Sequence, residues 1–274
     1  MRITSVNAAV TGGGAERVSR SLHEEYLARG HESWLLVGNR NAECASALEI
    51  PNERYRNPWA RSVRRVAAAA SRRSNVDGDA WWYTDRALRA AAQPLRYGRV
   101  ARGHEDFDHP ATPHLLELTP ETPELLHLHN LHGSYFDIRA LPNLADAVPT
   151  VLTMHDTWFL TGHCAHPFEC EGWLSGCKTC QHLDRYVPLY ADESAANFAL
   201  KRQVLRDSRL AIATPSRWLM DMAERSGVLT GALDARVIAN GVDTRVFKPG
   251  DRSAARAELG LDPDASSSAP LAGI

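Results

Sequence analysis

The sequence predicts an α/β protein built on a doubly wound parallel sheet, and three observations favour this fold class. Short apolar runs, typical of buried strands, alternate with helical segments from residue 3 to residue 239. A strand, a glycine turn, a helix and a second strand follow one another within residues 3–37, which is the pattern of a βαβ unit. A polar pair, His155-Asp156, directly follows an apolar run, and such sheets carry their chemistry at the carboxyl ends of strands.

The helix of the first βαβ unit can be recognised from its apolar spacing and from its end. Val18, Leu22 and Tyr26 recur at intervals of four, which predicts that they form the buried face. Gly30 follows the last turn, where a glycine commonly ends a helix. We therefore expect a strand over 3–6, a flexible glycine turn over 7–14, a helix over 15–29 and a strand over 33–37.

The alternation of strands and helices resumes after residue 124. His127 and His129 alternate with leucines, so they share one face of a strand. We expect strands over 125–129, 151–154, 210–213 and 235–239, and helices over 138–144, 194–206, 217–225 and 253–259. Residues 51–113 are less regular. The tail from residue 262 is rich in Ser, Ala and Pro and is predicted to be disordered.

Composition and charge exclude several classes of protein. The 274 residues are 44% apolar and 23% charged, which is ordinary for a globular protein. The formal net charge of -2 argues against a nucleic-acid partner. The sequence contains no apolar run of about eighteen residues, and the N-terminus MRITSVNAAV lacks the pattern of a signal peptide. We therefore expect a cytoplasmic protein whose cysteines are reduced thiols or metal ligands.

Four of the five cysteines lie in one loop, residues 155–182. Their spacing is C-x5-C-x6-C-x2-C, in which only the last pair has the spacing of a zinc knuckle. Four thiolates in a reducing compartment favour Zn2+ in a closed tetrahedral site, and a closed site is structural. The alternatives are buried free thiols and disulfides. The predicted metal ligands are Cys164, Cys170, Cys177 and Cys180, with His163, His166 and His182 interleaved among them.

His155 and Asp156 are the candidate catalytic residues. They should project from a strand end beside the glycine turn, where His155 could bind a sugar hydroxyl or a phosphate. The backbone of Gly12-Gly13-Gly14 could face the same ligand, because no Cβ stands in the way. This turn lacks the G-x-G-x-x-G spacing and the Walker lysine, so a turn that only reverses the chain is the alternative. Among the neighbouring histidines, we expect His127 and His129 to hold the wall of the site by hydrogen bonds and His132 to meet a ligand.

A basic segment lies in the irregular region. One predicted helix there combines Val63, Val66 and a run of four alanines with Arg61, Arg64, Arg65, Arg72 and Arg73. A solvated surface helix accounts for this pattern. The alternative is a basic amphipathic face that lies near anionic lipid or near a phosphate-bearing acceptor.

Several motifs, in the order in which they occur, resemble the N-terminal half of family 4 glycosyltransferases. They are Gly12-Gly13-Gly14-Ala15-Glu16-Arg17, Arg29-Gly30-His31-Glu32, His155-Asp156, Asn240-Gly241-Val242-Asp243 and Phe247-Lys248-Pro249. A further block is similar to the subgroup that builds bacterial exopolysaccharides such as colanic acid. It runs from His127 to Gly133 and continues as His155-Asp156-x-Trp158-x-x-Thr161-Gly162-x-Cys164 with the three later cysteines.

The resemblance implies a retaining enzyme of the GT-B fold, in which two Rossmann-like domains face each other across a cleft. It implies that residues 1–239 form a Rossmann-like acceptor-binding domain and that residues 240–274 are the hinge and the start of a nucleotide-sugar-binding domain. It further implies that Gly12, Gly13 and Gly14 lie against the donor diphosphate and the acceptor and that His155 contacts the transferred sugar. Asn130, His132 and Asn240 complete the expected donor- and acceptor-binding set.

The resemblance also implies partners. The donor would be a nucleotide-sugar, and the acceptor would be a glycan or a polyprenyl-linked sugar. We therefore expect contact with the inner face of the plasma membrane as a peripheral protein, with no nucleic-acid partner.

One departure from the family affects the expected activity. The second domain of the family holds the nucleotide through an Arg, a Lys and a Glu-x7-Glu motif, and this chain stops before them. We therefore expect a hexosyltransferase of polysaccharide biosynthesis that is inactive as the fragment given. The alternative is a non-catalytic glycan-binding Rossmann-like module with a structural zinc site. A nicotinamide dehydrogenase is disfavoured, because the glycine spacing differs and no acidic residue follows the second strand.

Overall fold

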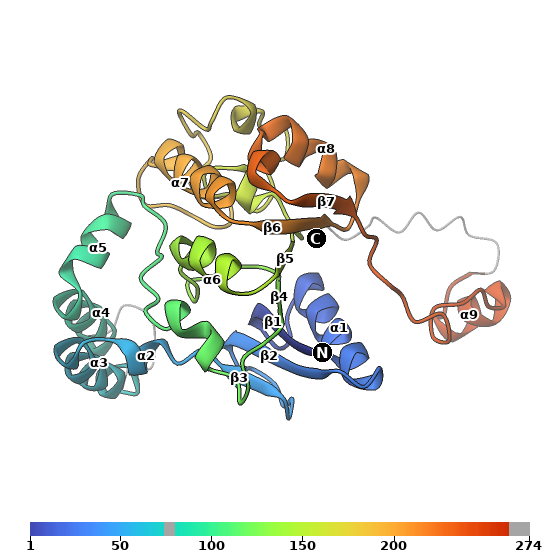
Figure 1. Ribbon diagram of the computed structural model, residues 1–274, viewed down its shortest axis with the longest axis horizontal. Coiled ribbons are helices and arrows are strands. Elements are labelled where there is room, and N and C mark those ends of the chain that lie inside the picture. Colours follow the sequence, from blue (N-terminus) through green and yellow to red (C-terminus); the bar gives the residue numbers. More distant parts are fainter. Residues whose placement is uncertain (74–79, 263–274) are drawn as a thin grey trace. The chain divides into compact units, whose positions relative to one another are not determined.

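The computed structural model describes residues 1–73 and 80–262, which divide into two compact units (Figure 1). The first unit is Met1–Ala239 and contains the sheet, and the second begins at Asn240. The second unit contains the short helix α9 (Arg252–Glu258), which the Asp251 carboxylate caps by accepting a hydrogen bond from the backbone N–H of Ala254. The tail predicted to be disordered lies almost wholly outside the described residues.

Seven parallel strands form the sheet of the first unit. Their order is β3-β2-β1-β4-β5-β6-β7, and every neighbouring pair is parallel. This topology confirms the predicted doubly wound parallel sheet. The strands are β1 (Arg2–Ala9), β2 (Glu32–Asn39), β3 (Ala47–Glu49), β4 (Leu125–Leu128), β5 (Thr150–Thr153), β6 (Leu210–Thr214) and β7 (Asp234–Val237).

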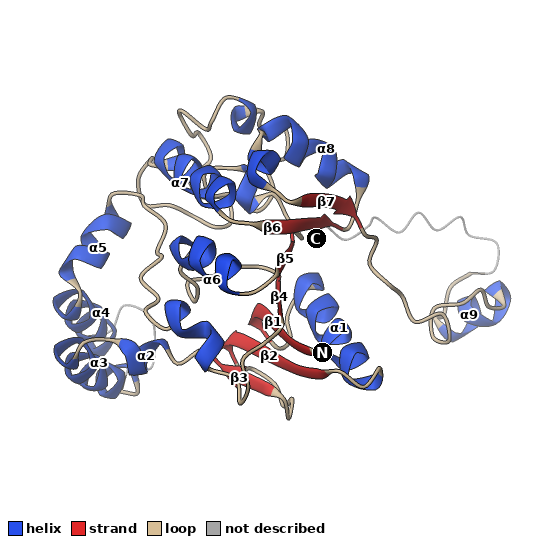
Figure 2. Ribbon diagram, viewed as in Figure 1, coloured by secondary structure: helices blue, strands red, loops and turns tan. Residues whose placement is uncertain are grey.

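Helices cover both faces of the sheet (Figure 2). Helix α1 packs against β1 and β2 on one face, whereas α6 and α7 pack against each other on the opposite face (Figure 1). Helix α8 packs against β6 and β7. These layer helices are α1 (Gly14–Ala28), α6 (Leu141–Ala147), α7 (Ser194–Asp207) and α8 (Arg217–Ser226).

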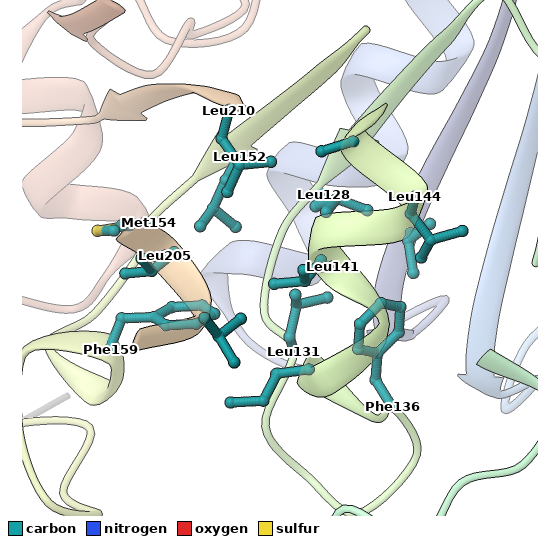
Figure 3. Close-up of a cluster of buried hydrophobic side chains, with 14 of the residues drawn as sticks. Leu128, Leu131, Phe136, Leu141, Leu144, Leu152, Met154, Phe159, Leu205 and Leu210 are labelled. Carbon is teal, nitrogen blue, oxygen red and sulfur yellow. The ribbon is translucent and has the colours of Figure 1, made fainter. Parts of the chain in front are cut away.

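An apolar core lies between the sheet and the helices α6 and α7 (Figure 3). Leu128 and Leu152 extend into it from β4 and β5, and Leu141 and Leu205 extend into it from the two helices. All four side chains are buried, and burial of one leucine contributes roughly 1.5–3 kcal/mol. This packing holds β4 and β5 side by side, so the loops that follow them leave the sheet together.

The strand order reverses between β1 and β4. Strand β1 pairs with β2 on one side and with β4 on the other. In doubly wound sheets, ligands bind at such a switch point, outside the carboxyl ends of the strands. The glycine turn, the histidines after β4 and the pair His155-Asp156 all follow strands that end at this edge. The sheet thus brings together three segments that are far apart in the sequence.

The first βαβ unit differs from its prediction in two details. Strand β1 includes Asn7–Ala9, which we predicted to be part of the flexible turn, because its pairing with β2 continues to Ala9 and Asn39. The buried face of α1 is also different from the predicted one. Its buried residues are Ala15, Ser19 and His23, whereas Val18, Leu22 and Tyr26 are half-buried.

A buried histidine explains the second difference. The two ring nitrogens of His23 share hydrogen bonds with the hydroxyls of Ser33 (2.7 Å) and Ser46 (2.6 Å). A polar ring can be buried when both nitrogens have partners. The apolar residues that the spacing identified therefore lie at the edge of the buried face of α1. The centre of that face is formed by small and polar residues, including His23.

Between β3 and β4, most of residues 52–73 and 80–101 form a helical excursion. It contains α2 (Asn52–Tyr55), α3 (Pro58–Ser71), α4 (Ala80–Ala92) and α5 (Pro94–Ala101). Only the helix that corresponds to α3 was predicted; β3, α4 and α5 were missed. Ion pairs fix the excursion to the segment that follows it. Arg96 Nη2 lies 2.5 Å from Asp106 Oδ2, and Arg56 Nη1 lies 3.3 Å from Asp108 Oδ2.

Candidate functional site

The glycine turn connects β1 to α1 at the switch point. Asn41, which follows β2, pins the turn: its Oδ1 accepts a hydrogen bond from the N–H of Thr11 (3.1 Å) and its Nδ2 donates to the carbonyl of Thr11 (2.6 Å). The N–H of Gly13 donates to Glu16 Oε2 (2.8 Å), so this amide is already occupied. Within the described chain, a Cβ built on Gly14 would meet no atom within 4 Å. The turn therefore presents open space at Gly14.

Three histidines form a stack at the carboxyl ends of β4 and β5. The rings of His127 and His129 lie 4.3 Å apart, and the rings of His129 and His155 lie 5.2 Å apart. His127 shares hydrogen bonds with the hydroxyls of Tyr26 (3.0 Å) and Thr153 (2.8 Å). The predicted role of His127 and His129 as wall residues agrees with these contacts, because both rings are buried and both make hydrogen bonds within the protein.

Burial keeps the stack neutral near pH 7. It lowers the pKa of His127 to about 4 and lowers the pKa of His129 and His155 as well. Asp156 and Glu16 oppose the shift at His155 through their negative charges. The stack therefore provides hydrogen-bonding groups and not positive charge.

The hydrogen bonds of the stack also fix the ring proton of His155. His129 Nδ1 and His155 Nε2 share a bond of 2.9 Å, and within the described residues the buried Nε2 of His129 has no partner. A buried orphan N–H is rarer than a buried orphan acceptor. We therefore assign the donated proton to His129 Nδ1, which leaves the Nδ1–H of half-buried His155 to donate to a ligand.

His132 and Asp156 form a second pair. His132 Nε2 lies 2.8 Å from Asp156 Oδ2, and Asp156 Oδ1 accepts a hydrogen bond from the N–H of Trp158 (2.9 Å). The second ring nitrogen of His132 lies 3.4 Å from the hydroxyl of Tyr186. A carboxylate that orients an imidazole in this way is the usual arrangement behind a histidine that accepts a proton.

A cavity of about 270 Å³ opens beside His132. Aromatic rings line part of its walls, and such rings stack on the apolar face of a sugar ring. The two carboxylates that also line it are bonded within the protein, Glu105 to Lys201 and Trp158, and Asp106 to Arg96. The aromatic residues are Phe107, Trp158, Tyr190 and Phe136, and the acidic residues are Glu105 and Asp106. Val100 of α5 also lines the cavity, so the helical excursion contributes one wall.

A buried ion pair supports this cavity from within the protein. Lys201 Nζ of α7 lies 2.8 Å from Glu105 Oε2 and 4.3 Å from the centre of the Trp158 ring. The indole N–H of Trp158 donates to the other oxygen of Glu105. Burial raises the pKa of Glu105 and lowers the pKa of Lys201, while the attraction between the two charges opposes both shifts. The pair thus fixes the orientation of the indole ring.

The structure places the predicted site residues in two groups. Of the predicted residues within the described chain, His132 lines the cavity, and the carboxylate of Asp156 bonds to the ring of His132. The glycine turn, His155 and Asn130 lie at the same edge of the sheet, but they do not line the cavity. The carbonyl of Asn130 accepts a hydrogen bond from the hydroxyl of Tyr135 (2.5 Å). Asn240 belongs to the second unit.

Sequence reasoning missed Glu105, Lys201 and Tyr190 as site residues. One signal was available for Lys201. It lies on α7 between Phe198 and Leu205, at the spacing of a buried face, and all three side chains are buried. A lysine at a buried helical position requires a buried partner, because an unpaired buried charge is costly.

The four cysteines of the loop are free thiols. The sulfurs accept hydrogen bonds from backbone N–H groups: Cys177 from Gly162 (3.2 Å) and Cys180 from His182 (3.4 Å). Burial raises the pKa of Cys177 to about 11 and also raises the pKa of Cys164 and Cys180. Burial therefore favours the protonated form of Cys164, Cys177 and Cys180.

The described residues do not present a preformed metal site. Within residues 1–73 and 80–262, no group of three or more His, Cys, Asp or Glu side chains is arranged to hold a metal ion. A Zn2+ ion would have to draw the sulfurs of Cys164, Cys170, Cys177 and Cys180 together and displace their protons. The zinc site stays a prediction.

Together, the fold and the site define an α/β protein with an aromatic-lined cavity of about 270 Å³ beyond the carboxyl ends of β4 and β5. No protein-family model matches the chain. The chain is similar to WcaC of Escherichia coli (strain K12), whose name assigns it to colanic acid biosynthesis as a glycosyl transferase. The two are 33% identical over 132 residues, which cover 44% of this chain and 32% of WcaC.

This comparison confirms the predicted resemblance to glycosyltransferases of bacterial exopolysaccharide synthesis. The chain spans about a third of the length of the relative it matches. The assignment to family 4 stays a prediction. No helix of the described residues is long and apolar enough to cross a membrane.

Proposed function

We propose that this chain is the acceptor-binding part of a glycosyltransferase of bacterial polysaccharide synthesis. The enzyme would move a hexose from a nucleotide-sugar donor onto a glycan or a lipid-linked sugar. The observation that carries the proposal is the cavity beside His132, which the aromatic side chains of Trp158, Phe107 and Tyr190 line. The similarity to WcaC supports the same conclusion, because the name of WcaC describes it as a glycosyl transferase.

In this proposal the two histidine groups have different tasks. His132 accepts a hydrogen bond from the acceptor hydroxyl that attacks the donor sugar, and Asp156 acts through His132 as a positioning residue. His155 donates its Nδ1–H to the transferred sugar or to a phosphate oxygen of the donor. The open space at Gly14 admits the diphosphate close to the N-terminus of α1, where the helix dipole favours an anion.

The donor requires a second domain in this proposal. In the resembling family the nucleotide is held by that domain, and residues 240–243 would be the hinge that leads to it. Retention of the anomeric configuration and assignment to family 4 are part of the proposal and rest on the resemblance. Transfer would need this second domain, because the groups that stabilise a leaving diphosphate lie there in the resembling family.

Location and metal complete the proposal. We propose that the protein acts in the cytoplasm, where nucleotide-sugars are made, and that it reaches lipid-linked acceptors as a peripheral protein on the inner face of the plasma membrane. We also propose that Zn2+ staples the loop of residues 155–182. The four soft thiol ligands within that loop support this assignment.

A binding and transfer experiment tests the proposed function. Saturation-transfer-difference NMR of residues 1–274 with oligosaccharides of colanic acid should show contact with the sugar protons, and His132→Gln should reduce that contact. Incubation with radiolabelled UDP- and GDP-sugars and a lipid-linked acceptor should give no transfer by the fragment. Transfer should appear when the protein is extended by its downstream reading frame.

Two outcomes would contradict the proposal. If the fragment binds no oligosaccharide, the cavity is not an acceptor site. If it binds oligosaccharide but the extended protein transfers none, the chain is instead a non-catalytic glycan-binding module.

A further inference from the structure

We propose that the helices α3, α4 and α5 form a surface that docks on anionic phospholipid. We name this surface the arginine-rich helices and define it by residues 58–73 and 80–102. The inference specifies the lipid chemistry and the residues of the membrane contact and does not depend on the bound sugar.

The arginine-rich helices are strongly basic. They contain ten arginines and one carboxylate, Asp85, and the sequence between them adds two aspartates, in a chain whose net charge is -2. Asp85 is already paired with Arg89 at 2.8 Å. Six arginines are exposed and have no carboxylate within 4 Å among the described residues. They are Arg65, Arg72, Arg73, Arg86, Arg99 and Arg102.

The arginine-rich helices also expose several large apolar side chains. Trp59 is 65% exposed, Tyr83 is 62% exposed and Leu95 is 84% exposed, although soluble surfaces seldom leave such side chains in water together. Val66 and Trp81 are exposed as well. Tryptophan and tyrosine favour the boundary between headgroups and acyl chains, and aliphatic side chains insert just below it.

Apolar and basic residues occur together on α3. Trp59 and Val66 lie seven residues apart, so they share one face of the helix. Arg73 follows at the same spacing, just beyond the end of α3. Its guanidinium lies 5.1 Å from the centre of the ring of Trp81, a residue of α4. Apolar and basic groups therefore share one face of α3 and its C-terminal end, as in a helix that lies in the plane of a bilayer.

This combination favours a lipid surface over a nucleic acid. A polyanion would be attracted by the arginines, but it would leave Leu95 and Val66 in water. An anionic bilayer satisfies both kinds of group at once. Position supports the same occupant, because Val100 of α5 lines the proposed acceptor cavity. A sugar carried on a membrane lipid would then arrive beside the cavity.

Vesicle flotation of the complete chain tests the proposal. We expect binding to vesicles of phosphatidylcholine mixed with phosphatidylglycerol, weak binding to phosphatidylcholine alone, and release by added NaCl. Arg65→Glu/Arg72→Glu should weaken binding by about tenfold or more, since each basic residue near the surface adds several-fold to partitioning. Trp59→Ala/Leu95→Ser should weaken it at low salt as well.

The structure offers a control of matched chemistry. Arg217 and Trp218 are an exposed arginine and an exposed tryptophan on α8, so Arg217→Glu/Trp218→Ala should bind vesicles like the unchanged protein. Circular dichroism and thermal unfolding should show that every variant is folded. Equal binding to both vesicle types, no binding to either, or equal losses in the α3 and α8 variants would overturn the proposal. A separate measurement of oligosaccharide binding shows whether the acceptor site is intact, so failure of one proposal is distinguishable from failure of the other.

Discussion

Lys201 and Glu105 form a buried ion pair whose nitrogen and oxygen lie 2.8 Å apart, and the pair joins α7 to the wall of the cavity. Removing one partner of such a pair leaves an unpaired buried charge, which destabilises a protein by about 3–5 kcal/mol. We expect Lys201→Met to lower the free energy of unfolding by that amount in urea titrations. Lys201→Met/Glu105→Leu should recover a large part of the loss.

A second ion pair on the same helix provides the control for this prediction. Arg206 and Asp207 are 3.2 Å apart, but their side chains are 61% and 45% exposed. Arg206→Met should therefore change the free energy of unfolding by less than about 1 kcal/mol. Similar losses for Lys201→Met and Arg206→Met would show that the buried pair contributes no more than a surface pair.

The histidine stack predicts the dependence of stability on pH. Burial lowers the pKa of His127 from 6.5 to about 4 in the folded state. Between these values the unfolded chain binds more protons than the folded chain, so the free energy of unfolding falls as the pH is lowered from about 6.5 to about 4. The shift corresponds to about 3 kcal/mol. His129 and His155 act in the same direction.

Urea titrations between pH 7 and pH 4 measure this effect. His127→Gln should flatten the slope in that range, because glutamine can still bond to Tyr26 and Thr153 but does not titrate. His114→Gln is the control, since it makes the same substitution at an exposed histidine outside the stack. An unchanged slope in His127→Gln would mean that His127 is not neutral in the folded protein.

The cavity predicts a specific effect of Tyr190. This side chain is 79% exposed and lines the cavity, so Tyr190→Ala should leave the stability unchanged. Loss of one stacking ring should weaken oligosaccharide binding by about tenfold, or about 1.4 kcal/mol. Titration calorimetry measures oligosaccharide binding by Tyr190→Ala and by Tyr190→Phe. Tyr190→Phe should bind nearly as well as the unchanged protein if the ring makes the contact.

A tyrosine outside the cavity is the matched control. Tyr83 is similarly exposed, and Tyr83→Ala should bind oligosaccharide like the unchanged protein. If both tyrosine variants bind equally well, the aromatic wall does not hold a sugar.

Sequence patterns predicted the sheet because local spacing determines it. Apolar runs such as Val151–Met154 must be buried on both faces, and the glycine turn and Gly30 mark the ends of α1. The helices α4 and α5 were missed because Trp81-Trp82-Tyr83-Thr84, near the start of α4, are residues of low helix propensity and α5 is only eight residues long. Contacts with distant residues fix them instead, such as the pairing of Arg96 with Asp106.

The candidate site was predictable only in part, for a related reason. The position of His155-Asp156 after a buried strand indicated the correct edge of the sheet. The partners of Asp156 and Trp158 could not be read from spacing. His132 precedes Asp156 by 24 positions, and Glu105 precedes Trp158 by 53 positions, so only the fold brings them together.

The glycine turn predicts a separation of binding from stability. A Cβ on Gly14 would meet no described atom within 4 Å, and Gly14 is the first residue of α1, so Gly14→Ala should keep or slightly raise the free energy of unfolding. If a diphosphate packs against this position, the added methyl group should weaken binding of a nucleotide-sugar in the extended protein by about tenfold. Unchanged binding in Gly14→Ala would place the ligand elsewhere.

The cysteine loop predicts the metal content of the purified protein. If Zn2+ staples the loop, elemental mass spectrometry should find near-stoichiometric zinc, and four thiols should react with a thiol reagent only after a chelator is added. Cys177→Ser should lose the metal, whereas Cys44→Ser should keep it, because Cys44 lies outside the loop. Freely reacting thiols without metal would contradict the staple. The loop would then be held by its backbone hydrogen bonds to sulfur and by the packing of Trp173 in the core.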